Sequence, residues 1–233
     1  MLALLVSTVL AASPSLAPGS VLSASLVVEE KEWRADGTAF VVETQGEPVY
    51  VTTLTLAGPV GGMPVQLTGD DVPAMLSAEL VDLATGERVD RTDRGRFLAG
   101  TCAVASCTLV DDLAAFDVQQ DKRRWAKVSP APLPLAAGCP EEKTPLFLMG
   151  ARGVVYGELA SCSPWEVMVS IYPGNAMGGT QGAPWVNAAG EVVAMHVDVR
   201  SDVRGRFSRA MSAPVISARL DGRALPSPWV ATD

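Results

Sequence analysis

The residues best suited to form a chemical site lie between Met177 and His196. Small residues crowd one short turn there, where missing side chains permit positive φ angles and close backbone approach: Gly178, Gly179, Gly182, Ala183 and Pro184. In this turn Gln181 carries a carboxamide, which cannot be activated to attack a carbonyl as a hydroxyl can. Residues 185–186 and 192–195 read as two short strands. The stretch therefore predicts a tight loop that leads into a β-hairpin.

This loop and hairpin resemble the nucleophile loop of the trypsin-like serine proteases. The family motif is Gly-Asp-Ser-Gly-Gly-Pro, and residues 179–184 read Gly-Thr-Gln-Gly-Ala-Pro. The third motif residue is the nucleophilic serine, so the resemblance puts Gln181 at the nucleophile position. It also makes the backbone amides of Gly179 and Gln181 the equivalent of the oxyanion hole. The neighbouring hydroxyl of Thr180 is an alternative nucleophile only if a base lies within hydrogen-bond distance.

The family's catalytic histidine follows a strand of the first barrel. Residues 37–44 and 48–56 are rich in β-branched and aromatic side chains, which predicts a hairpin. Laid on the family pattern Leu-Thr-Ala-Ala-His, residues 51–55 put Thr55 at the position of the histidine. The chain contains one histidine, His196, so no residue near Thr55 supplies an imidazole base.

Two more residues complete the candidate site. The segment 112–116, Asp-Leu-Ala-Ala-Phe, matches the family's aspartate segment, so Asp112 takes the triad-aspartate position. The alternative for Asp112 is an aspartate that caps a turn before a strand. In family members selective for glutamate, a histidine placed like His196 lines the primary specificity pocket; the alternative is a structural histidine on a strand. Thr55, Asp112 and Gln181 thus keep the order of the triad without its base and nucleophile.

Short strands and turns must position these residues. With 21 glycines, 17 prolines and no long helical period, the composition favours an all-β protein. The resemblance implies two six-stranded antiparallel barrels and a short C-terminal helix, for which residues 210–220 have apolar spacing. We expect a signal peptide over 1–17, a first barrel over 20–125, a connecting segment over 126–140, and the second barrel with the helix over 141–233. Residues 200–207 read as a polar turn.

The first residues and the cysteines indicate the compartment. An apolar run too short to span a bilayer is followed by small residues, which predicts a secretory signal. The alternative is a buried strand, since no Lys or Arg precedes the run. The four cysteines fit a secreted or periplasmic protein with two disulfides, for which three pairings are possible, and reduced thiols are the alternative. Proximity in the sequence favours Cys102–Cys107 and Cys139–Cys162. Their spacing does not fit a structural zinc site, and we expect no metal or other cofactor.

The charge and the site restrict the function. A net charge of −8 opposes sequence-independent binding to nucleic acid or anionic lipid, and no membrane span is expected. Without nucleophile and base, we expect no peptidase activity. The sequence predicts a secreted pseudoprotease that binds a peptide or protein. The alternatives are an unorthodox hydrolase with a different nucleophile and a structural β domain of a larger assembly.

Overall fold

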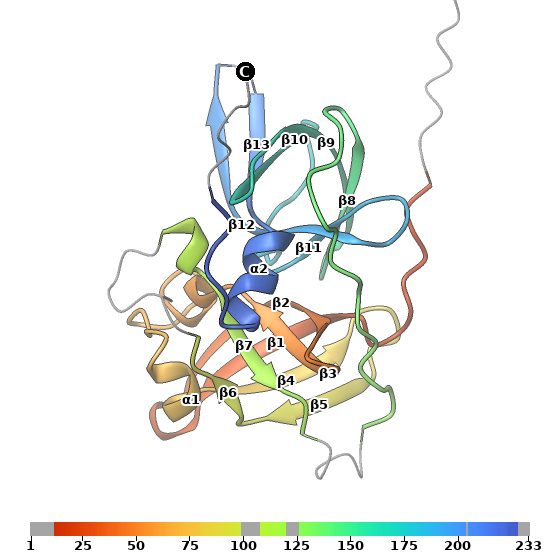
Figure 1. Cartoon of the computed structure of the whole chain (residues 1–233). Coiled ribbons are helices and arrows are strands. Elements are labelled where there is room, and N and C mark those ends of the chain that lie inside the picture. The colour runs from red at the N-terminus through yellow and green to blue at the C-terminus, as the bar shows by residue number, and fades with distance from the viewer. Residues whose placement is uncertain (1–11, 99–107, 120–125, 204, 228–233) are drawn as a thin grey trace, which may run out of the picture.

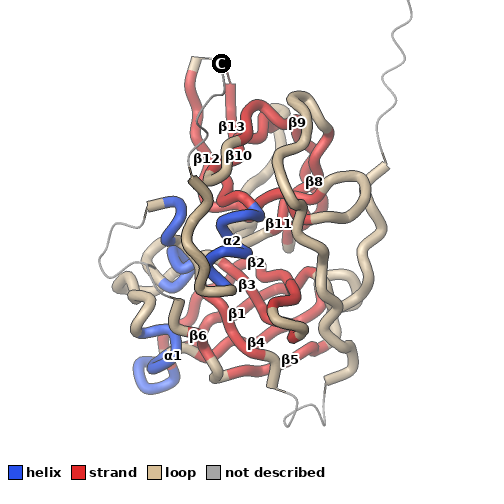
Figure 2. Tube along the Cα trace, in the orientation of Figure 1, coloured by secondary structure: helices blue, strands red, loops and turns tan. Residues whose placement is uncertain are grey.

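Strands make up most of the regular secondary structure of the described residues. The computed structural model describes residues 12–98, 108–119, 126–203 and 205–227. The strands form two bodies, stacked one above the other in Figure 1, and helix α2 (Ala213–Leu220) lies between them. The predicted all-β class with a short C-terminal helix is confirmed. Figure 2 shows how little of the chain is helical.

The first body is a strongly curled antiparallel sheet with the strand order β5-β4-β1-β2-β3-β7-β6. Its strands are β1 (Val21–Val28), β2 (Trp33–Thr44), β3 (Glu47–Thr52), β4 (Ser77–Asp82), β5 (Arg88–Thr92), β6 (Gly95–Arg96) and β7 (Ala114–Asp117). Only Asp93 and Arg94 separate β5 from β6, although these strands lie at opposite ends of the order. The sheet therefore curls so far that its two end strands, β5 and β6, follow each other in the chain. The sequence predicted six strands here; the structure has seven, because β5 and β6 are two parts of an interrupted strand.

The second body is a closed six-stranded barrel with the order β10-β13-β12-β11-β8-β9, as predicted. Its strands are β8 (Pro145–Gly150), β9 (Gly153–Cys162), β10 (Glu166–Ile171), β11 (Pro184–Val186), β12 (Val192–Asp202) and β13 (Gly205–Ser212). The hairpin of β12 and β13 stays paired as far as Asp202 and Gly205, and it projects from the barrel in Figure 1. The prediction of a polar turn over 200–207 was wrong, because backbone pairing continues although the projecting side chains are polar.

Three apolar clusters hold the fold together. One fills the first body, around Leu26, Tyr50 and Phe116, and one fills the second, around Trp185. The third lies between the bodies and joins residues of both to helix α2, for example Phe40, Val51, Met195, Met211 and Ile216. Burial of this much apolar surface favours a fixed arrangement of the two bodies. The predicted helix over 210–220 starts later, at Ala213, where a proline in the first turn suits a helix start.

Short helical turns shape the loops of the first body. The chain was predicted to remain a strand to Leu56, but β3 ends at Thr52 and a 3-10 helix (Leu54–Ala57) follows. Similar turns lie at Glu29–Lys31 and Leu109–Asp111, and α1 (Asp71–Met75) precedes β4. The correction at Leu54–Ala57 matters for the site, because it puts Thr55 on a turn rather than on a strand.

One predicted disulfide can be located. Cys139 and Cys162 are bonded, which ties the segment before β8 to the end of β9. The other predicted pair, Cys102 and Cys107, lies outside the described residues. Across the described ranges, no helix is long and apolar enough to cross a membrane.

Candidate functional site

A cleft of about 480 Å³ lies where the two bodies meet. Its lining comes from the turn after β3, from the segment before β7, from the loop before β11 and from the β12–β13 hairpin: Thr55, Val60, Thr108, Leu109, Asp112, Met177, Gly178, Gln181, Val197, Asp198, Val199, Arg206 and Arg209. The structure therefore brings Thr55, Asp112 and Gln181 to one cavity, although they are far apart in the chain.

Thr55 and Asp112 are joined by two hydrogen bonds. The Thr55 N–H donates to Asp112 Oδ1 over 2.6 Å, and the Thr55 hydroxyl donates to Asp112 Oδ2. Backbone N–H groups at the start of a helical turn lack acceptors within the turn, and the Asp112 carboxyl is the acceptor for the Thr55 N–H. Burial raises the pKa of Asp112, and the hydrogen bonds from Thr55 oppose that shift. The carboxyl is thus buried and held by the turn that carries Thr55.

The loop before β11 is fastened to β2. Thr38 donates its N–H to the carbonyl of Gln181 over 3.0 Å and its hydroxyl to the carbonyl of Gly179 over 3.0 Å. A Cβ atom at Gly182, where φ is +80°, would lie 2.2 Å from the carbonyl oxygen of Thr38 and 2.2 Å from Thr52 Oγ1. Only glycine fits this conformation and this contact. The predicted tight loop is therefore a junction between the two bodies.

Solved structures of one protease share this architecture. The Rv3671c protease of M. tuberculosis in its active form has a TM-score of 0.56 and 13% identity, covering 94% of this chain and 91% of that chain. An inactive form of the same protein has a TM-score of 0.53 and 12% identity, covering 93% and 98% of the two chains. A serine-to-alanine mutant in the inactive form has a TM-score of 0.51 and 12% identity, covering 91% and 98%.

The chain has the trypsin-like protease fold. No protein-family model matches the sequence, and no curated protein matches it either. At 12 to 13% identity the likeness is one of fold, so the chemistry of this trypsin-like cleft must be read from its own side chains.

The alternative nucleophile Thr180 is not accessible from the cleft of this trypsin-like fold. Its side chain is buried, and its hydroxyl donates to the carbonyl of Met177 over 2.6 Å. By contrast, the N–H groups of Gly179 and Gln181 have no acceptor within the described ranges, and Gly179 has φ of +75°. Their assignment as the equivalent of an oxyanion hole stays a prediction.

His196 lies behind the cleft rather than in it. It is fully buried on β12, and its Nδ1 is 2.7 Å from Ser208 Oγ. That hydroxyl also accepts the indole N–H of Trp185 over 2.8 Å, so its own proton can be donated to Nδ1. Burial and the charge of Arg206 lower the pKa of His196 to about 4. The imidazole is therefore neutral near pH 7, and its assignment to the specificity pocket stays a prediction.

Two arginines of β13, Arg206 and Arg209, line the cleft, and neither was predicted from the sequence. Arg209 Nε lies 2.5 Å from a Glu166 carboxylate oxygen and its Nη1 lies 3.4 Å from Asp198. Arg206 Nη1 donates to the carbonyl of Asn175 over 2.9 Å. The signal in the sequence was weak: Arg206 belongs to an Arg-Gly-Arg-Phe run that occurs at both 94–97 and 204–207.

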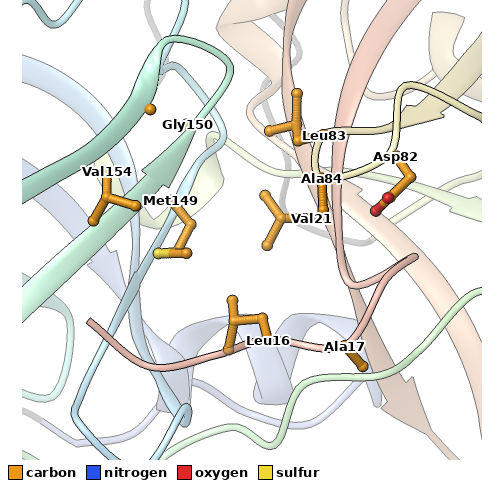
Figure 3. A pocket seen from close by; sticks show the side chains of 10 residues that line it. Leu16, Ala17, Val21, Asp82, Leu83, Ala84, Met149, Gly150 and Val154 are labelled. Carbon is orange, nitrogen blue, oxygen red and sulfur yellow. The ribbon is translucent and has the colours of Figure 1, made fainter. Parts of the chain in front are cut away.

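A second cavity, of about 270 Å³, is also lined by residues of both bodies (Figure 3). Side chains of both bodies and of the segment before β1 surround it, among them Leu16, Val21 and Met149. Its one charged residue, Asp82, already accepts hydrogen bonds from the Gly19 N–H and from Thr85. Few polar groups of this cavity remain free to orient a polar ligand, so the trypsin-like cleft is the better candidate site.

Proposed function

We propose that the protein is a pseudoprotease that binds a peptide or a segment of a protein in its trypsin-like cleft. The observation that carries the proposal is the meeting of Thr55, Asp112 and Gln181 in one cavity, in the chain order of a catalytic triad. Threonine then stands at the position of the base and glutamine at that of the nucleophile. The chain's one imidazole is buried elsewhere.

The proposed site favours binding over turnover. A hydroxyl group at Thr55 cannot accept and return a proton near neutral pH as an imidazole does, and a carboxamide at Gln181 forms no acyl intermediate. The amides of Gly179 and Gln181 are the oxyanion-hole equivalents in this proposal. They would donate to a carbonyl oxygen of the bound chain, which is binding without chemistry.

We place the protein outside the cytoplasm, as a secreted or periplasmic protein. The Cys139–Cys162 disulfide supports this placement, because disulfides persist mainly in oxidising compartments.

Reconstruction of the triad tests the proposal. The unmodified protein should neither cleave peptides nor react with a fluorophosphonate probe, and Gln181→Ser alone should stay unreactive because its serine lacks a base. The double variant Thr55→His with Gln181→Ser should be labelled, since Asp112 can orient the new imidazole. Labelling of the unmodified protein would contradict the proposal, and a folded but unreactive double variant would contradict the assigned triad positions.

One contact favours a second candidate, an unorthodox hydrolase. The Thr55 hydroxyl lines the cleft and donates to the buried carboxyl of Asp112, an arrangement in which a carboxylate could accept a proton from a nucleophilic hydroxyl. Thr55→Val tests it directly. Peptide or ester hydrolysis by the purified protein that Thr55→Val abolishes would replace the pseudoprotease proposal.

A further inference from the structure

Two guanidinium groups flank the loop that forms one edge of the cleft. Arg206 reaches this loop from β13 and donates to the carbonyl of Asn175. Arg152, from the turn between β8 and β9, lies over Gly178: a Cβ atom there would be 2.9 Å from Arg152 Nη1 and 3.3 Å from Cζ. The missing side chain at Gly178 therefore lets a second positive charge approach the same loop.

Neither guanidinium is neutralised by the part of the protein that the structure describes. No carboxylate of those residues lies within ion-pair distance of Arg206 or Arg152. Of the other charged groups of the cleft, Arg209 pairs with Glu166 and with Asp198 Oδ2, and Asp112 is held by Thr55. Asp198 Oδ1 is buried without a hydrogen-bond partner among the described residues. The chain as a whole is acidic, with 26 acidic and 18 basic residues. Two arginines without acidic partners at one loop therefore form a local concentration of positive charge.

The geometry suits a carboxylate. A guanidinium has five N–H donors in a planar fork, and Arg206 is bonded to one backbone carbonyl. The remaining donors can bind both oxygens of a carboxylate, the strongest of the common side-chain interactions. Arg206 is half-buried in the cleft, which strengthens such a contact relative to one on the open surface. Met177 and Val199, which line the same cavity, would cover the methylene groups of an acidic side chain.

We propose that the cleft selects an acidic ligand, in which a peptide carboxylate is bound by Arg206 with Arg152 at the rim of the site. This proposal rests on the proposed binding function and names the chemical class of its ligand. Two sources share this chemistry, an aspartate or glutamate side chain and the carboxylate at the end of a chain. Arg206 is then the residue that determines specificity.

Fluorescence anisotropy with three labelled peptides tests the proposal on the full chain. The first contains an internal glutamate and has an amidated end, the second has glutamine in its place, and the third is the glutamine peptide with a free carboxylate end. We expect at least one carboxylate peptide to bind about tenfold or more tightly than the amidated glutamine peptide. The preference should weaken as salt is added. The tighter of the two carboxylate peptides identifies the source.

Substitutions of the arginines test which side chain causes the preference for carboxylate peptides. Arg206→Gln should remove the difference between the peptides, Arg206→Lys should keep part of it, and Arg152→Gln should reduce it by a few-fold because that side chain is exposed. Arg223→Gln is the control, since it removes the same charge from an exposed arginine that pairs with Asp221 outside the cleft. A thermal melt of each variant establishes that it is folded.

The outcomes separate this inference from the function on which it rests. Equal binding of all three peptides, no binding of any of the three, or a preference that survives Arg206→Gln would overturn the acidic ligand. Equal binding without cleavage would leave the pseudoprotease intact. Cleavage of the peptides, or labelling by a fluorophosphonate, would instead overturn the pseudoprotease.

Discussion

The two walls of the cleft use their polar groups differently. On the first wall, Asp112 and Thr55 are bonded to each other and the carboxyl is buried. On the second wall, the amides of Gly179 and Gln181 have no acceptor, and Arg206 has no acidic partner, within the described ranges. Polar groups that satisfy one another stabilise the fold, whereas unpaired donors at a cavity are suited to a ligand. Under the proposed function, the first wall is thus structural and the second wall contacts the ligand.

The junction between the walls should be the most sensitive position. In Gly182→Ala the new Cβ would overlap the carbonyl of Thr38, so we expect the free energy of unfolding to fall by about 4 kcal/mol or more. Gly46→Ala is the matched control, because Gly46 has the same φ of +80° with no atom within 4 Å of the added Cβ. The control should lose only about 1 to 2 kcal/mol. Urea denaturation measures both, and equal losses would refute a close contact at the junction.

Acidification should lower the free energy of unfolding because of His196, which is buried behind the second wall. Its pKa is about 4 when folded and 6.5 as a free side chain, so only the unfolded chain binds this proton between those values. The free energy of unfolding should therefore fall by about 3 kcal/mol as the pH drops from 7 to 4. Above pH 7 the residue contributes no pH dependence.

The variant His196→Gln isolates this effect. Asp112, whose pKa is raised, acts with the opposite sign and is present in both proteins, so it cancels in the difference between them. Denaturation curves at several pH values give that difference. If both proteins lose stability equally on acidification, His196 is not the group responsible.

On the first wall, removal of the carboxyl should affect stability and not recognition. Asp112→Ala leaves the N–H and hydroxyl of Thr55 without their acceptor, and we expect a loss of about 2 kcal/mol. Asp36→Ala, at an exposed position, should cost much less. Peptide affinity measured where the variant remains folded should be unchanged. A large loss of affinity would show that the first wall also binds the ligand.

The smallest effect on stability is expected at Gln181. Its side chain is bonded to no other side chain among the described residues, so Gln181→Ala should change the free energy of unfolding by no more than about 0.5 kcal/mol. Peptide affinity should change, because Gln181 lines the cleft. Denaturation and anisotropy on the same sample compare the two effects, and a loss of stability without any change in affinity would reverse the assignment of the walls.

Local sequence patterns explain why the general architecture was predictable. The glycine-rich loop, the hairpin after it and the order of Thr55, Asp112 and Gln181 all lie within short stretches whose residue types carry the signal. Strong β propensity, as in residues 37–44, predicted the strands, whereas the two barrels were implied by the family resemblance. The boundary after Thr52 was missed because Leu54, Thr55 and Leu56 suit a strand by propensity. Contact with Asp112 from a distant segment favours a helical turn there instead.

The second wall depends on contacts between segments that no local sequence pattern predicts. Arg152 and Gly178 are separated by 26 positions in the sequence (178 − 152), and only the closure of the second barrel brings them together. The extended β12–β13 hairpin was also missed, since its exposed, charged residues resemble a turn. Arg206 could therefore be seen as a repeated motif in the sequence but not as part of the cleft.

The segment before β1 contributes to the contact between the two bodies. Leu16 packs into the cluster between them and helps to line the second cavity. If the predicted signal peptide is removed before Leu16, this side chain stays in place, whereas removal after Ala17 deletes it and leaves Met149 more exposed. The cleavage position would then determine how much apolar contact joins the two bodies that form the cleft.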